Sequence, residues 1–200
     1  MHNVSELSEA LNPIKQRVMR EFLKLLKNKD YCDISVSELT KAAKVGRTSF
    51  YRIFNRKLDV LMACHEQLFS QLFASKNTAE DWLAKEPAAN VVEMLRFFNS
   101  NSAFRRSMAY QLGSDMALAN RLLRQQLEVF ISERLQQCFG ERLQIPASIL
   151  GCAIGGLYFN LFTMGVMGSA LDNELNSPER QAGYLQQLTS AQIKAALAES

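Results

Sequence analysis

Apolar residues recur with the period of an α-helix along nearly the whole chain, and this repeat constrains the fold more than any other feature. Near the N-terminus, for example, Ile14, Val18 and Phe22 lie four residues apart and share one helical face. No stretch shows the alternation of apolar and polar residues that a half-buried strand requires, and no internal repeat is evident. The sequence therefore predicts an all-α protein.

Two local patterns predict where the first helices begin. Asn12 precedes Pro13, and we expect a helix to start there, because Asn accepts hydrogen bonds from free N–H groups and Pro has no donor to lose. Ser35 and Glu38 have the spacing of a capping box at the start of a second helix. That helix should end near Ala43, and a third should follow over 47–54.

Longer helical patterns fill the rest of the chain. One begins at Lys57 and extends to about residue 73. The others are expected at 87–99, 103–112, 115–139, 146–168 and 178–199, the last with a candidate break near Thr189.

Positive charge is concentrated in the first third of the chain. Residues 1–60 contain 12 Lys and Arg against 7 Asp and Glu, whereas residues 61–200 contain 11 against 13. Lys and Arg that bind phosphates release condensed counterions, and this effect dominates nonspecific affinity for nucleic acids. The asymmetry favours a nucleic-acid partner for the N-terminal part, and a solvated basic surface without a partner is the alternative.

Composition and motifs exclude several classes of protein. With 48% hydrophobic and 22% charged residues, the chain lacks the bias of a disordered protein. Its four cysteines are far apart in sequence and should be reduced thiols, and we expect neither a metal nor a cofactor. With two histidines and no phosphate loop or nucleophile motif, an enzyme is not expected.

One apolar stretch raises the question of a membrane. Residues 143–171 contain no charged side chain and are numerous enough to cross a bilayer. Five glycines, Pro146 and several polar residues lower the hydropathy of this stretch, and no basic flank follows it. We therefore expect a buried helix and no membrane span, with a membrane-tethered DNA-binding protein as the alternative. No secretory signal follows Met1, so a cytoplasmic location is predicted.

Residues 34–61 resemble the helix-turn-helix head of the TetR family of transcriptional regulators. In that family a capped helix is entered through a three-residue sequence, namely Ile or Val, then Ser or Thr, then Val. A Val follows the turn, a Phe-Tyr pair lies in the recognition helix, and a Lys begins the next helix. The matching residues are Ile34, Ser35, Val36, Val45, Phe50, Tyr51 and Lys57. The sequence of residues 46–51, Gly-Arg-Thr-Ser-Phe-Tyr, resembles that of the DhaS-like branch of the family.

The sequence departs from the family pattern at three positions of this motif. The family commonly has Ala, Gly and Ser where this chain has Thr40, Lys44 and Gly46. If Lys44 takes the left-handed conformation usual in that turn, it carries a penalty of roughly 1–2 kcal/mol. Gly46 lacks the hydroxyl of the better helix caps.

The motif also indicates which residues face DNA. A small core would hold two helices nearly at right angles, so that the start of the second enters the major groove. The residues predicted to form this core are Leu39, Ala43, Val45, Phe50 and Phe54. Side chains there could read base edges, and the resemblance implies that Tyr51 and Lys57 hold phosphates. The predicted DNA-binding residues are Ser35, Ser37, Gly46, Arg47, Thr48, Ser49, Tyr51, Arg52 and Lys57.

The resemblance implies a head at 1–56 and a regulatory body at 57–200, with 57–73 as the connecting helix. In the family the body dimerises through its last two long helices, and 146–168 matches one of them. A two-fold pair places two recognition helices about 34–36 Å apart, which predicts a palindromic operator. The candidate dimer residues are Gly151, Ile154, Gly155, Tyr158, Phe162, Leu185 and Leu188.

The body also contains apolar residues suited to line a small-molecule cavity, although an ordinary core explains them equally well. These are Met94, Phe97, Phe98, Phe104, Met108, Phe130, Phe159 and Met164. The resemblance thus implies a nucleoid-associated homodimer, most commonly a repressor, that an unknown effector releases from double-stranded DNA. A protein of this fold that acts through a protein partner is the alternative.

Overall fold

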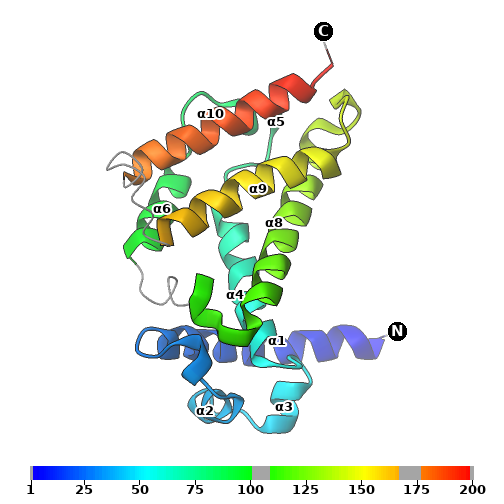
Figure 1. Cartoon of the computed structure of the whole chain (residues 1–200). Helices are drawn as coiled ribbons and strands as arrows, with labels where there is room; N and C mark the ends of the chain where they lie inside the picture. The colour runs from blue at the N-terminus through cyan, green and yellow to red at the C-terminus, as the bar shows by residue number, and fades with distance from the viewer. Residues whose placement is uncertain (1, 101–108, 167–176, 199–200) are drawn as a thin grey trace. The chain divides into compact units, whose positions relative to one another are not determined.

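The computed structural model of the chain describes residues 2–100, 109–166 and 177–198 (Figure 1). Every regular element among these residues is helical, apart from one isolated antiparallel bridge between Leu143 and Leu197. The predicted all-α fold class is therefore confirmed. The chain divides into two compact units, one formed by residues 1–65 and 102–119 and the other by residues 66–101 and 120–200.

The first unit contains the expected series of short helices. Helix α1 (His2–Leu26) is followed by the 3-10 turn η1 (Tyr31–Asp33), α2 (Val36–Ala42), α3 (Arg47–Tyr51) and the first half of α4 (Lys57–Leu72). A second 3-10 segment, η2 (Ala109–Asp115), contacts η1 and leads into α8 (Met116–Phe139). The compact units thus divide within α4, whereas the predicted head ended just before it.

The expectation that α1 begins at Asn12 was wrong. The helix begins at His2 and continues through Pro13. Proline inside a helix removes one N–H donor, but helical spacing of apolar residues continues across it from Leu7 through Leu11 to Ile14. The apolar pattern therefore extends further than the local start signal suggested.

Aromatic and aliphatic side chains form the core of the first unit. Phe22 packs edge-on against Tyr31 at a centroid distance of 6.3 Å, and both side chains are buried. The residues predicted to clamp the two short helices are buried as well, except that Val45 is only half-buried. The buried clamp residues are Leu39, Ala43, Phe50 and Phe54.

The second unit is a bundle of longer helices. The end of α4 leads to α5 (Ala79–Leu83) and α6 (Ala89–Ser100), and α8 continues through the 3-10 turn η3 (Gly140–Arg142) to α9 (Ala147–Val166). Helix α10 (Pro178–Ala196) packs against α5, α6 and α9. Trp82, Tyr158 and Leu185 are among the side chains fully buried between these helices.

Two expectations about the helices of this unit need correction, and one predicted helix lies largely outside the described residues. Helix α5 was not expected, because its five residues are too few to show a periodic pattern, although Thr78 and Asp81 form a capping box at its start. Helix α10 does not break at Thr189, whose side chain is buried on the core face, so that packing outweighs the local cap signal. The predicted helix at 103–112 falls largely outside the described residues, and its last part belongs to the 3-10 segment η2.

Glycines bring α9 close to α8 within the same chain. A Cβ atom on Gly151 would lie 2.1 Å from the Oγ atom of Ser132, and one on Gly155 would lie 2.9 Å from Cγ of Glu128. Both positions therefore require glycine for the two helices to pack at this distance. Among the described helices, none is both long and apolar enough to cross a membrane.

Candidate nucleic-acid interface

Helix α2 begins at a well-formed cap. The backbone of Ser35 is extended, and its Oγ atom accepts a hydrogen bond from the N–H of Glu38 at 3.1 Å. The Glu38 carboxylate accepts a hydrogen bond from the Lys29 Nζ atom at 2.6 Å. The cap leaves Ser35 and Ser37 exposed at the start of α2, next to backbone N–H groups that favour an anion.

The turn between α2 and α3 has the expected left-handed residue. Lys44 has a φ of 52°, and it is the one residue other than glycine with a positive φ in the described part of the chain. The N–H of Val45 then donates to the carbonyl oxygen of Thr40 at 3.0 Å, which closes the turn. Gly46 caps α3 without a side-chain hydrogen bond.

The first turn of α3 presents polar side chains to solvent. Arg47 and Thr48 are exposed, and Ser49 is half-buried. An Arg47 Nη2 atom donates a hydrogen bond to Ser37 Oγ at 3.2 Å, which joins the starts of α2 and α3. This bond holds the guanidinium beside the start of α3, where it could meet a guanine edge.

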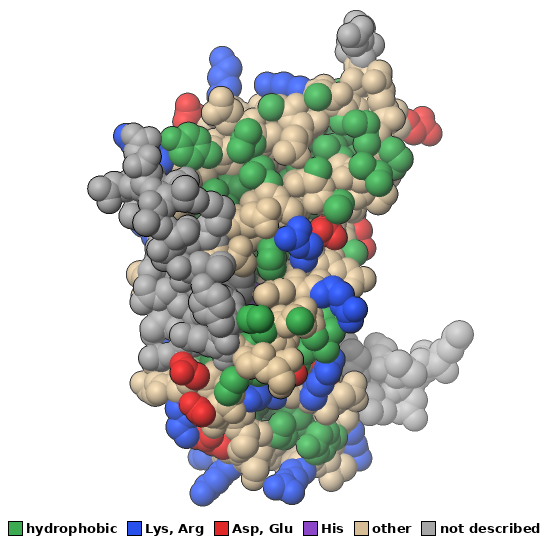
Figure 2. All heavy atoms as spheres, in the orientation of Figure 1, with side chains coloured by type: hydrophobic (Ala, Val, Ile, Leu, Met, Phe, Trp, Pro, Cys, Tyr) green, Lys and Arg blue, Asp and Glu red, His purple; other side chains and the backbone are tan. Residues whose placement is uncertain are grey.

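Tyr51 and Arg52 extend this surface along α3. The Tyr51 side chain is 53% exposed, and its ring lies edge-on to that of buried Phe50, with centroids 5.3 Å apart. Phe50 therefore packs against the Tyr51 ring from the core, while about half of Tyr51 stays exposed to solvent. Lys and Arg side chains project from the surface over α2 and α3 (Figure 2).

Lys57 takes a different position from the one expected of a phosphate ligand. Its Nζ atom donates hydrogen bonds to the carbonyl oxygens of Tyr31 and Ile34, the latter at 2.7 Å. The same atom lies 4.0 Å from the centroid of the Tyr31 ring. Burial lowers the pKa of Lys57, while nearby Cys32 and Asp115 oppose this effect. At least two of the three ammonium donors are thus engaged within the head.

Two contributors to this unit were not predicted from the sequence. Tyr31 donates a hydrogen bond to Asp115 Oδ2 at 2.6 Å, and the two residues are 84 positions apart. Asp59 caps the start of α4, because its Oδ2 atom accepts hydrogen bonds from the backbone N–H groups of Asn55 at 2.8 Å and Arg56 at 3.2 Å. Only the second has a local signal, an acidic residue in the first turn of a helix.

The predicted ligand-lining residues have mixed environments in the second unit. Phe159 is buried, Met94 and Phe130 are half-buried, and the side chain of Phe97 is 43% exposed. The Phe130 ring packs on that of Phe73, at a centroid distance of 5.7 Å. The remaining predicted side chains lie outside the described ones, namely Phe98, Phe104, Met108 and Met164.

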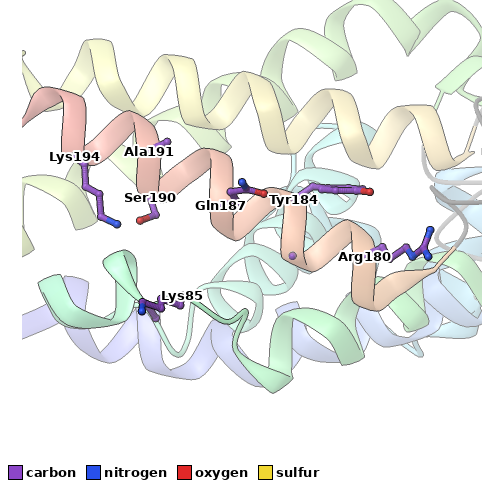
Figure 3. A pocket seen from close by; sticks show the side chains of 9 residues that line it. Lys85, Arg180, Tyr184, Gln187, Ser190, Ala191 and Lys194 are labelled. Atoms are coloured by element: carbon purple, nitrogen blue, oxygen red, sulfur yellow. The ribbon is translucent and has the colours of Figure 1, made fainter.

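An open groove of about 590 Å³ runs along α10 instead, and none of the predicted ligand residues lines it (Figure 3). Lys85, Arg180 and Lys194 contribute positive charge to this groove. Arg180 and Lys194 are 14 residues apart on one helix, which corresponds to roughly 21 Å along its axis. No small anion could therefore contact both ends of the groove.

Most of the predicted dimer residues are buried in packing within the chain itself. Ile154, Tyr158 and Leu185 are fully buried, and Phe162 is 6% exposed. Gly151 and Gly155 lie against α8, as described above. Leu188 is 47% exposed, and other large apolar side chains exposed on α9 and α10 are Ile149 and Tyr184.

No protein-family profile and no curated protein matches the sequence. The fold is nevertheless similar to solved structures of TetR-family regulators. A putative TetR-family regulator from Syntrophomonas wolfei aligns with a TM-score of 0.59 and 18% identity, over 93% of this chain and 97% of that chain.

Two further structures align equally completely. The TetR-family repressor FadR from Thermus thermophilus, in complex with lauroyl-CoA, has a TM-score of 0.56 and 18% identity, over 93% of this chain and 96% of that chain. The TetR-family repressor AlkX from Dietzia sp., implicated in biodegradation of n-alkanes, has a TM-score of 0.56 and 14% identity, over 92% and 97%. The chain therefore has the fold of TetR-family regulators.

Proposed function

We propose that this chain is a DNA-binding transcriptional regulator of the TetR type, which binds a palindromic operator as a homodimer and responds to a small molecule. The observation that carries the proposal is the capped α2, the left-handed turn at Lys44, and the exposed first turn of α3. In helix-turn-helix proteins this is the part that enters the major groove. The finer assignment to the DhaS-like branch rests only on residues 46–51.

Arg47, Thr48 and Ser49 are the residues that we assign to base reading. The Arg47 guanidinium can pair with the O6 and N7 atoms of guanine, and the two hydroxyl groups can donate or accept. Ser35, Ser37, Gly46, Tyr51 and Arg52 surround this turn and are assigned to the phosphate backbone, which positions the head without reading sequence. We assign Lys57 mainly to its hydrogen bonds within the head and only secondarily to a direct phosphate contact.

The dimer interface is assigned to the exposed faces of α9 and α10. Ile149 is 61% exposed and Leu188 is 47% exposed, and the two helices that carry them pack against each other. A two-fold pairing would remove these side chains from water. Of the residues predicted from the sequence, only Leu188 has a largely exposed side chain to offer a second chain.

We assign the effector site to the body. The effector is a small molecule, and no specific ligand is named. The fold supports this, since FadR from Thermus thermophilus holds lauroyl-CoA. Such a ligand acts by binding one arrangement of the body more tightly than another. Both FadR and AlkX are described as repressors, so we assign repression to this chain, acting on chromosomal DNA in the cytoplasm.

Selection of bound duplexes from a random library tests this function. The purified full chain should enrich an inverted repeat whose half-site centres lie one or more helical turns apart, about 34–36 Å for a single turn. Library members without an inverted repeat serve as the matched controls. Enrichment of no sequence, or of single half-sites only, would contradict the proposal.

A further inference from the structure

Tyr31 lies where the starts of three helices meet. Its hydroxyl group donates a hydrogen bond to Asp115 Oδ2 at 2.6 Å, and Asp115 directly precedes α8. Tyr31 opens η1, which ends two residues before the Ser35 cap of α2. Its carbonyl oxygen accepts a hydrogen bond from Lys57, the first residue of α4. One buried residue thus contacts the segments that lead into α2, α4 and α8.

The contact with Asp115 is specific. The Tyr31 side chain is 2% exposed, so a displaced Asp115 would leave its hydroxyl group without water to replace the lost acceptor. Burial and the Asp115 carboxylate both raise the pKa of Tyr31, so the phenol keeps its proton and remains a donor. Loss of this hydrogen bond therefore carries a free-energy penalty.

The backbone beside Asp115 is shaped to fit this contact. Gly113 has a φ of 56°, and a Cβ atom at this position would lie 2.6 Å from Cys32 Sγ. Glycine therefore permits both the left-handed turn and the close approach of η2 to η1. The two 3-10 segments therefore lie in close contact at Gly113.

We propose that the Tyr31–Asp115 latch, the hydrogen bond between these two residues, couples the position of the first turn of α8 to the position of α2 and α3. The inference rests on the proposed function, because it describes how the DNA-binding surface is regulated. α8 runs on to Phe139 as one helix, so a shift of this helix reaches Asp115 through its own backbone. Coupling is reciprocal, so the state of the head also affects α8.

Hydrogen exchange measured by mass spectrometry on the full chain tests the latch without DNA. Asp115→Ala removes the acceptor and should speed exchange in the peptide covering 35–51, and Tyr31→Phe should speed it in the peptide covering 116–123, each by about fivefold or more. Glu141→Ala removes an exposed carboxylate from η3 in the second unit and is the matched control, which should leave both peptides unchanged.

The variants are chosen so that a folding defect is distinguishable from a lost latch. Tyr31→Phe keeps the ring that packs on Phe22 and lies under Lys57, so this variant decides the question if Asp115→Ala speeds exchange in every peptide. Unchanged exchange in 116–123 for a folded Tyr31→Phe variant would overturn the proposal.

A second arm adds the selected operator duplex as the probe. In the wild-type chain the duplex should slow exchange in 35–51 and also in 116–123, whereas in Tyr31→Phe it should slow exchange only in 35–51. Equal slowing of 116–123 in both proteins would overturn the latch. If no duplex binds the wild-type chain, the proposed function fails, and the arm without DNA still decides the latch.

Discussion

The Lys57 ammonium lies 4.0 Å from the centroid of the Tyr31 ring and donates hydrogen bonds to the backbone carbonyls of Tyr31 and Ile34. A residue that the family resemblance assigns to DNA is thus part of the internal structure of the head. This relationship makes stability, as well as DNA affinity, the property to measure for variants at this position.

Replacing Lys57 with Met should destabilise the head. The substitution keeps the apolar stem but removes the ammonium donor to the carbonyl oxygens of Tyr31 and Ile34, and we expect a loss of about 1–3 kcal/mol in the free energy of unfolding. Urea denaturation followed by far-ultraviolet circular dichroism measures this, with Lys57→Arg as the control that keeps the charge. Unchanged stability with weakened DNA binding would assign Lys57 to a phosphate instead.

Replacing Arg47 with Ala should change which sequences are bound. Loss of a bidentate contact to guanine costs about 1–3 kcal/mol at one base pair and relaxes the preference there. Arg52→Ala is the matched control, because a lost phosphate contact weakens all duplexes alike. Competition binding with operators substituted at single positions separates the two patterns. Uniform loss in both variants would contradict the division between reading and anchoring residues.

Replacing Lys44 with Gly should stabilise the protein. Lys44 has a φ of 52°, a conformation that glycine adopts without strain. The gain is offset by the greater freedom of glycine in the unfolded chain, and a net of about 0.5–1 kcal/mol is expected. Lys44→Ala keeps the strain and should give no such gain. Equal midpoints of denaturation for the two variants would show that the turn is not strained.

His65 should make the protein less stable in mild acid. Burial lowers the pKa of His65 to about 4, from 6.5, so below pH 6.5 the unfolded chain takes up a proton that the folded chain does not. The unfolding free energy therefore falls as the pH drops from 6.5 to 4, by up to about 3 kcal/mol. Denaturation midpoints between pH 7 and 4 should depend less on pH in His65→Asn. Identical pH profiles would contradict the assignment.

Replacing Leu188 with Glu should weaken the dimer. A carboxylate buried in an apolar contact between subunits carries a desolvation cost, and the dissociation constant should rise by at least about tenfold. Leu23→Glu is the matched control, since Leu23 is 38% exposed on α1 in the other compact unit. Sedimentation velocity measures both. Dissociation of the dimer by the Leu23 variant alone would move the interface away from α9 and α10.

The parts of the site that the sequence predicted are those with local signals. The Ser35 cap, the left-handed Lys44 and the buried Phe50 each depend on residues within a few positions in the chain. The fold class follows from the helical period in the same way. Local chemistry therefore sufficed for the helix-turn-helix surface.

The other features depend on tertiary contacts that no local pattern shows. Tyr31 and Asp115 are separated by 84 positions, so nothing near either residue indicates their hydrogen bond. Helix α9 is apolar on all sides, and the sequence could not separate the face that packs within the chain from the face left exposed. Ile154 was therefore assigned to the dimer, whereas Ile149 is the exposed residue.

The salt dependence of binding to the selected duplex tests the central claim most directly. The account predicts two chains per duplex and a binding constant that falls steeply with salt, with a logarithmic slope of about −5 or steeper if each head engages at least three phosphates. A slope near zero, or one chain bound per duplex, would contradict it.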